Sequence, residues 1–230
     1  MSQNGGHAAE QDAEVIRPDI GKLTERQGIF PAARLDREAG AAVVLNEPVL
    51  ISRVAGGDME GQNIRDLLSR VTLVLAPAVD PDGIDLVTSA LDAETTAAAK
   101  ALAENYPDIP FPSGWKANIR GIDLNLQYPA GWSTAREIKF AAGYTRPGPR
   151  DYVGPAPLVA PESLAMYGFT RALDPLLTLS YHTQGRVIYW QYDGYDVPGS
   201  EAIARQFAAV SGYDVAATPY AAGHAGYKDW

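Results

Sequence analysis

The feature that most constrains the fold is the continuous apolar run VTLVLAPAV, residues 71–79. A short run rich in β-branched residues is typical of a strand covered on both faces, so we expect it near the centre of a sheet. The turn sequence DPDG follows at once, and the alanine-rich segment AETTAAAKALAENY predicts a helix. A buried strand followed by a helix predicts an α/β protein.

Other segments alternate between strand and helix patterns. Strands are predicted within AAVVLNEPVLISRV, which Pro48 interrupts, and as a pair formed by TLSYH and RVIYW around the connection TQG. Helices are predicted over NIRDLLSR, PESLAMYGFTRAL and SEAIARQFAAVSG, the last capped by Ser200 and ended by Gly212. Residues 107–158 are rich in proline, glycine and tyrosine, so we expect a long irregular loop there. Loops of this length are usually functional.

The domain organisation predicted from length and periodicity is simple. A chain of 230 residues with 46% hydrophobic composition can bury one sizeable core. Residues 1–40 carry scattered charges without a sustained period, so we expect a poorly ordered or divergent N-terminal segment there. Residues 41–230 are predicted to form one domain.

Charge and hydropathy exclude two classes of partner. Nineteen basic residues against 28 acidic ones give a net charge of −9, which would repel a phosphate backbone, so nucleic acid is not an expected partner. No segment reaches the roughly 20 apolar residues of a membrane helix, and we expect no membrane partner. The polar start MSQNGGHAAEQDAE lacks the apolar core of a signal peptide. As written, the sequence indicates the cytoplasm and leaves the compartment open.

The absence of cysteine limits the possible metal sites. With no thiolate available, a metal must be held by histidine and carboxylate side chains. The imidazoles of the sequence are His7, His182 and His224.

Five segments, in this order, resemble successive signature blocks of the zinc carboxypeptidase family: AVDPDGIDLV, KANIRGIDLNLQYPAGW, DYVGPAPLVAPES, LSYHTQGRVIYW and AAGHAGYKDW. They lie within residues 64–230 and are most similar to the γ-D-glutamyl-diamino-acid peptidases, which act on bacterial cell-wall peptides. The resemblance implies a mixed, twisted sheet with helices on both faces. It also implies a zinc ion at the carboxyl ends of the central strands.

In that family a His-x-x-Glu pair and a distant histidine bind the zinc, and the fourth position is left for water. His182 matches the distant histidine. For the pair, His7 and Glu10 have the right pattern but lie far upstream, with no room for a preceding strand. Glu47 is an alternative that puts Val44 at the histidine position, and a third possibility is that neither site is the pair.

The resemblance also implies residues that contact the substrate. Asn125 matches an asparagine that hydrogen-bonds it, whereas Leu126 stands where carboxypeptidases have an arginine that binds a terminal carboxylate. A leucine cannot pair with a carboxylate, which disfavours simple removal of carboxy-terminal residues. Lys116 and Arg120 lie where the family places a cation for the developing oxyanion, and we favour Arg120. Tyr220 matches a mobile tyrosine that closes over the substrate.

Two residues complete the comparison with the family. His224 has no ligand role there, and we expect it to be structural or exposed. The general-base glutamate of the family lies on a strand after the AGYKDW block, and no carboxylate of this sequence matches it. We therefore expect a fragment or a decayed copy that lacks the family's C-terminal strand and helix.

The predicted function is zinc-dependent hydrolysis of γ-D-glutamyl-diamino acid bonds in cell-wall peptides by metal-activated water. The alternative is a catalytically inactive or fragmentary carboxypeptidase-like domain that binds peptide.

Overall fold

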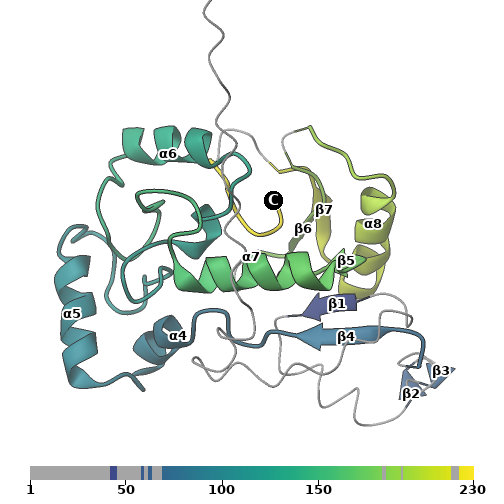
Figure 1. Cartoon of the computed structure of the whole chain (residues 1–230), viewed down its shortest axis with the longest axis horizontal. Coiled ribbons are helices and arrows are strands. Elements are labelled where there is room, and N and C mark those ends of the chain that lie inside the picture. Colours follow the sequence, from purple (N-terminus) through teal and green to yellow (C-terminus); the bar gives the residue numbers. More distant parts are fainter. Residues whose placement is uncertain are drawn as a thin grey trace, which may run out of the picture. The chain divides into compact units, whose positions relative to one another are not determined.

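The structure, a computed structural model, describes residues 42–45, 58–59, 62–63, 69–182, 185–192, 194–218 and 223–230 (Figure 1). The predicted N-terminal segment and most of the predicted helix NIRDLLSR lie outside these residues. The described residues contain both strands and helices, which confirms the mixed α/β content.

The largest sheet has three parallel strands in the order β4-β1-β5. β1 (Ala42–Leu45) lies between β4 (Thr72–Leu75) and β5 (Leu177–Thr178). The prediction that residues 71–79 form a central, doubly covered strand is wrong, since β4 is an edge among the described strands and its residues are only partly buried. The strand also ends at Leu75, shortly before Pro77, which has no N–H to donate to a ladder.

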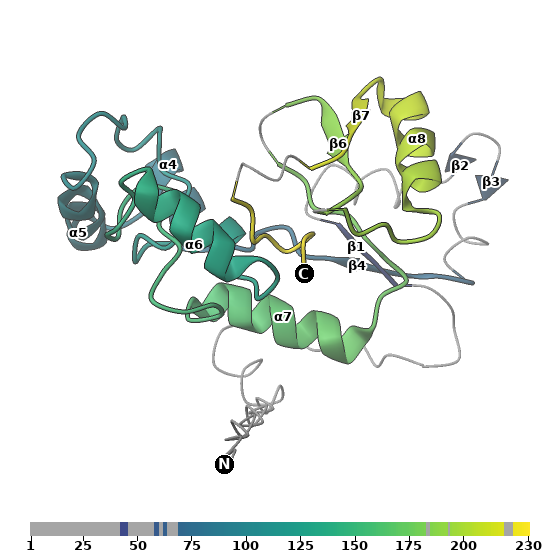
Figure 2. The same ribbon diagram turned by 90° about the horizontal axis from the view of Figure 1, so that it is seen from above.

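A second parallel pair contains β6 (Val187–Tyr189) and β7 (Asp214–Ala216). α8 (Ser200–Ser211) connects them and lies against both, as expected because parallel strands need a crossover connection (Figures 1 and 2). The predicted pairing of TLSYH with RVIYW is therefore wrong: β5 pairs with β1, and β6 pairs with β7. A short antiparallel pair joins β2 (Asp58–Met59) to β3 (Gln62–Asn63).

The predicted helices in the described part of the chain are confirmed as α5 (Ala93–Ala103), α7 (Pro161–Leu173) and α8. α8 ends at Gly212, as predicted, in a left-handed conformation. Its N-cap is Gly199 rather than Ser200, whose hydroxyl donates to the carbonyl of Val197 at 2.8 Å. None of the described helices has the length and apolar character needed to cross a bilayer.

The DPDG sequence begins a helix instead of forming an isolated turn. α4 (Pro81–Thr88) starts with proline at its first position, and its N-cap Asp80 accepts from the N–H of Gly83 at 3.2 Å. The buried residues that pack together around α4 and α5 are Leu86, Ala99, Ala103, Trp115 and Ala117. One core cluster thus joins these two helices to the segment that follows them.

Residues 107–158 are more regular than predicted. They contain a 3-10 turn, η1 (Leu124–Leu126), and the ten-residue helix α6 (Trp132–Ala141). The N-cap of α6 is Gly131 in a left-handed conformation, and no side chain caps the first turn. The helix consequently has none of the start signals by which a sequence pattern reveals a helix.

Tyr106 ties the end of α5 to the loop after α6. Its hydroxyl donates to the carbonyl of Arg146 at 2.8 Å and accepts from the N–H of Arg146 at 3.0 Å, and its ring centroid lies 5.4 Å from that of Tyr144. Tyr106→Phe is expected to lower the free energy of unfolding by about 1 kcal/mol, because both bonds are lost while the ring packing remains. Urea unfolding measures the change. Tyr213→Phe, at an exposed tyrosine, is the control, and equal losses in the two variants would contradict the expectation.

Candidate functional site

The predicted oxyanion residues lie on a turn that Asn118 organises. The side-chain oxygen of Asn118 accepts from the N–H groups of Arg120 at 3.1 Å and Ile122 at 3.0 Å. Its amide nitrogen donates to Glu162 of α7 at 3.1 Å, and the residue is fully buried. Lys116 and Arg120 are themselves exposed. Asn118 therefore fixes the backbone of the turn that presents Arg120, while the N–H of Lys116 donates to the carbonyl of Pro149 at 2.7 Å.

Asp123 joins this turn to a distant loop and holds the backbone of Asn125. One carboxylate oxygen accepts from the N–H of Asn125 at 3.1 Å, and the other accepts from the N–H of Asp151 at 2.9 Å. The N–H of Asp123 donates to the carbonyl of Tyr152 at 2.9 Å. Burial raises the pKa of Asp123, because the charged form has lost its water. The residue is thus a buried crosslink next to the predicted substrate-binding asparagine.

Gln127 anchors the same segment to residues 153–160. Its amide nitrogen donates to the carbonyls of Val153 at 2.5 Å and Ala156 at 3.1 Å, and its oxygen accepts from the N–H of Ala160 at 2.9 Å. The side chain is fully buried, so these protein groups satisfy it in place of water. Gln127 holds the loop of the DYVGPAPLVAPES block at a fixed position beside the turn.

The C-terminal segment 223–230 lies against this assembly. The N–H of Tyr128 donates to the carbonyl of Ala225 at 2.9 Å, and the ring centroid of Tyr128 lies 5.5 Å from Tyr227 and 6.1 Å from Trp230. Gly226 lies directly against the side chain of Asn125, because a Cβ at this position would meet the side-chain oxygen of Asn125. Three blocks that lie far apart in the sequence therefore meet around Asn125, which remains exposed.

Leu126 lies in the core beside this site. It is 3% exposed and packs in one cluster with Ala135, Val153 and Ala225. Leu126 is therefore a core residue, and it belongs to the turn η1.

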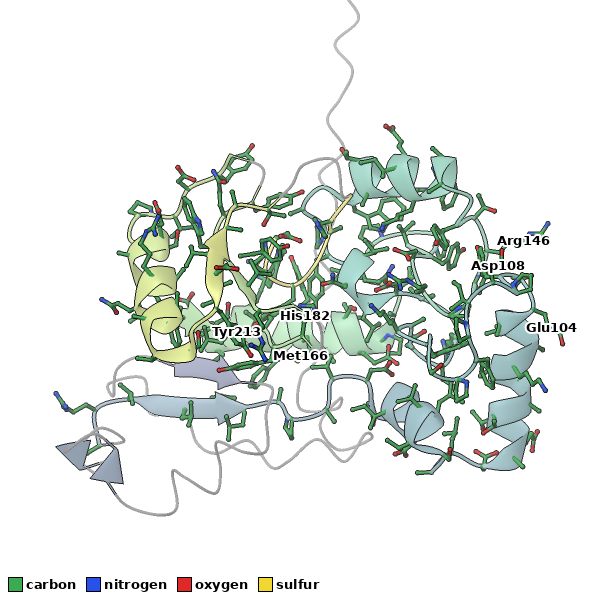
Figure 3. All side chains as sticks on the ribbon, turned by 180° about the vertical axis from the view of Figure 1, so that it is seen from behind. Glu104, Asp108, Arg146, Met166, His182 and Tyr213 are labelled. Atoms are coloured by element: carbon green, nitrogen blue, oxygen red, sulfur yellow. The ribbon has the colours of Figure 1, made fainter. Side chains whose placement is uncertain are left out.

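His182 and His224 lie in different surroundings. His182 is exposed on the segment between β5 and β6; Figure 3 shows it near the middle of the ribbon, away from Glu104 and Asp108 at the end of α5. His224 is half-buried, and burial lowers its pKa, with smaller contributions in the same direction from the charges of Lys228, Lys139 and His182. The two imidazoles are therefore close enough to interact electrostatically.

The described residues do not by themselves make a zinc site. No group of three or more histidine, aspartate or glutamate side chains in this part of the chain could hold a metal ion. Of the predicted ligands, His182 lies among the described residues, whereas His7 and Glu10, or Glu47, lie outside them. Tyr220 also lies outside them.

Several buried polar residues were not singled out from the sequence as parts of the site. Asn118, Asp123 and Gln127 support the predicted site residues from beneath, yet none of them was predicted. All three lie in residues 107–158, for which the sequence predicts an irregular loop, and nothing in that pattern indicates that these side chains are buried. A polar side chain at a buried position needs hydrogen-bond partners and often organises a loop.

Comparisons with known proteins agree with this assembly. The zinc carboxypeptidase family matches residues 50–230. The γ-D-glutamyl-L-diamino acid endopeptidase 1 of Lysinibacillus sphaericus is 43% identical over 172 residues, which cover 75% of this chain and 42% of that protein. An uncharacterised protein of Bacillus subtilis, YqgT, is 38% identical over 168 residues, covering 71% of this chain and 42% of that protein.

The chain thus spans about two fifths of the length of these relatives. No solved structure matches it. Because the family match extends over most of the sequence and includes the blocks that meet around Asn125, the chain belongs to the zinc carboxypeptidase family.

Proposed function

We propose that this chain is part of a zinc-dependent peptidase that hydrolyses γ-D-glutamyl-diamino acid bonds in bacterial cell-wall peptides. The observation that carries the proposal is the meeting of the segment 116–128, the loop at Asp151 and the segment 223–230 around the exposed Asn125. The named activity of the Lysinibacillus relative, at 43% identity, supports the choice of bond. In this proposal the sheet is the mixed, twisted sheet of the family, with helices on both faces.

The proposal gives each site residue a role. Asn125 hydrogen-bonds the substrate, and the exposed cations Arg120 and Lys116 stabilise the negative charge that develops on the attacked carbonyl. Leu126 offers no charge to a terminal carboxylate, which favours cleavage at an internal amide. His182 binds the zinc, with its remaining ligands among residues outside the described ones.

Zinc content and hydrolysis test the proposal together. The purified chain is expected to bind about one zinc per molecule and to cleave a γ-D-glutamyl-diamino acid peptide. His182→Ala should lose both properties while keeping its circular dichroism spectrum, because the exposed side chain contributes little to packing. His224→Gln, at the other described imidazole, is the control and should retain its zinc. A folded wild-type chain that binds no zinc would refute the proposal.

A second function is binding of the same peptide without hydrolysis. The observation in its favour is that the described part of the chain contains no group able to hold a metal. Calorimetric titration of the peptide in the presence of a chelator separates the two functions. Binding that persists without zinc, with no product formed when zinc is restored, would favour the second.

A further inference from the structure

Lys139, near the end of α6, lies against a buried carboxylate that no role described above requires. Its ammonium donates to one oxygen of Asp151 at 2.7 Å, and the guanidinium of Arg150 donates to the other oxygen at 2.7 Å. The side chains of Lys139 and Asp151 are 19% and 12% exposed, while that of Arg150 is 39% exposed. Lys139 is therefore the more deeply buried counterion, and its pairing is less screened by water.

Asp151 is in turn hydrogen-bonded to Asp123. Its backbone has a φ of 66°, an uncommon conformation for a residue other than glycine, and its N–H points to the carboxylate of Asp123 at 2.9 Å. The other oxygen of Asp123 holds the N–H of Asn125. A continuous series of polar contacts thus runs from Lys139 through Asp151 and Asp123 to the backbone of Asn125.

We propose that Lys139 is a positioning residue: by neutralising Asp151 beside Asp123, it keeps the backbone of Asn125 in the geometry that binds substrate. The inference rests on the proposed function for its substrate, but the contacts themselves can be tested without any substrate. Arg150 is the second counterion of Asp151 and lies nearer the surface than Lys139.

The charges around the pair determine how pH should act on it. The charge of Asp151 raises the pKa of Asp123, and the charge of Lys139 lowers the pKa of both carboxylates. Arg150 acts on both from the same loop, and Asp80 at the start of α4 adds a further negative charge facing Asp123. Glu162 of α7 and Asp82 of α4 face Asp80 in turn.

The direction of the pH effect follows from Asp151. Burial alone would raise its pKa, but the hydrogen bonds from Lys139 and Arg150 outweigh burial and hold the pKa below its ordinary value. A lowered folded-state pKa adds stability above the ordinary pKa of aspartate, and this stability disappears as pH falls through the folded-state value. Removing Lys139 should therefore lower the free energy of unfolding most at neutral pH and progressively less in acid.

The test compares Lys139→Met, Lys139→Arg and Lys100→Met. Lys100 is the matched control, since it also lies in the last turn of a helix but is exposed. The urea midpoint of Lys139→Met should fall at pH 7, and its difference from the wild type should shrink as pH is lowered below about 3.8, through the lowered folded-state pKa of Asp151. Its KM for the γ-D-glutamyl-diamino acid peptide should rise roughly 10-fold with kcat little changed, as expected when only binding geometry is lost. Lys139→Arg should recover most of both losses, and Lys100→Met should show neither.

The backbone amide resonance of Asn125 gives a readout that needs no turnover. It should shift in Lys139→Met and stay near its wild-type position in Lys139→Arg and Lys100→Met. An unchanged Asn125 resonance, or a midpoint that falls equally at all pH values with KM unchanged, would overturn the inference. If the wild type neither binds nor cleaves the peptide, the proposed function fails, while the Asn125 resonance still decides whether Lys139 positions this backbone.

Discussion

Gln127→Glu is expected to lower the free energy of unfolding by about 3 to 5 kcal/mol at pH 7. The amide nitrogen of Gln127 donates to the carbonyls of Val153 and Ala156 at a fully buried position. A glutamate puts an acceptor oxygen against these two acceptors. It also buries a negative charge whose hydrogen-bond partners, the backbone groups of Val153, Ala156 and Ala160, include no cation. Urea unfolding followed by circular dichroism measures the loss.

The pH dependence of this variant distinguishes the charge from a general disturbance of packing. A buried glutamate takes up a proton more readily than one in the unfolded chain, and its neutral form can donate one of the two lost hydrogen bonds. The deficit should therefore shrink as pH is lowered. Gln206→Glu, on an exposed part of α8, is the matched control and should change stability by less than about 0.5 kcal/mol. A similar deficit in both variants would contradict the contacts assigned to Gln127.

The elements that could be predicted from the sequence are those with local signals. The alanine content of α5, the proline at the start of α7 and Gly212 after α8 all act within a few residues of the helix they define. Strand pairing is not local. β5 and β6 lie near each other in the sequence, yet β5 pairs with β1, where Leu177 lies opposite Val43. β6 pairs with β7 across the helix α8, as parallel strands joined by a crossover connection do.

The residues of the site also divide into those that could be predicted from the sequence and those that could not. Asn125 could be proposed because it matches an asparagine of the family, and Lys116 and Arg120 because they lie where the family places a cation. Asn118 and Gln127 could not, since the partners that explain them lie in other segments, at Glu162 and at residues 153–160. The role of a buried polar side chain depends on its hydrogen-bond partner, and the sequence does not specify which distant group that partner is.

Substitution of Asp80 is expected to produce the second large change in the free energy of unfolding, because burial destabilises the ionised form of its carboxylate. Burial raises the pKa of Asp80 to about 7, and the negative charges of Glu162, Asp82 and Asp123 act in the same direction. Its carboxylate caps α4 by accepting from Gly83, and the first turn leaves no room for a Cβ at that glycine. The side chain is thus enclosed at a position where its ionised form is costly.

The sign of the effect follows from proton linkage. Because the folded-state pKa exceeds the ordinary value of 3.8, the folded chain binds more protons than the unfolded chain between about pH 4 and pH 7. Stability contributed by Asp80 is therefore fully present below pH 4 and is lost as pH rises through 7. A shift of this size corresponds to about 2 to 4 kcal/mol.

Asp80→Asn isolates this contribution, because asparagine keeps the cap and removes the charge. The variant should match the wild type near pH 4 and exceed its free energy of unfolding by about 2 to 4 kcal/mol at pH 8. Asp82→Asn removes an exposed charge from the first turn of the same helix, and should show no such gain. Urea unfolding of the three proteins across this pH range gives the comparison. A difference between Asp80→Asn and the wild type that stays constant with pH would mean that Asp80 ionises in the folded chain as freely as in the unfolded one.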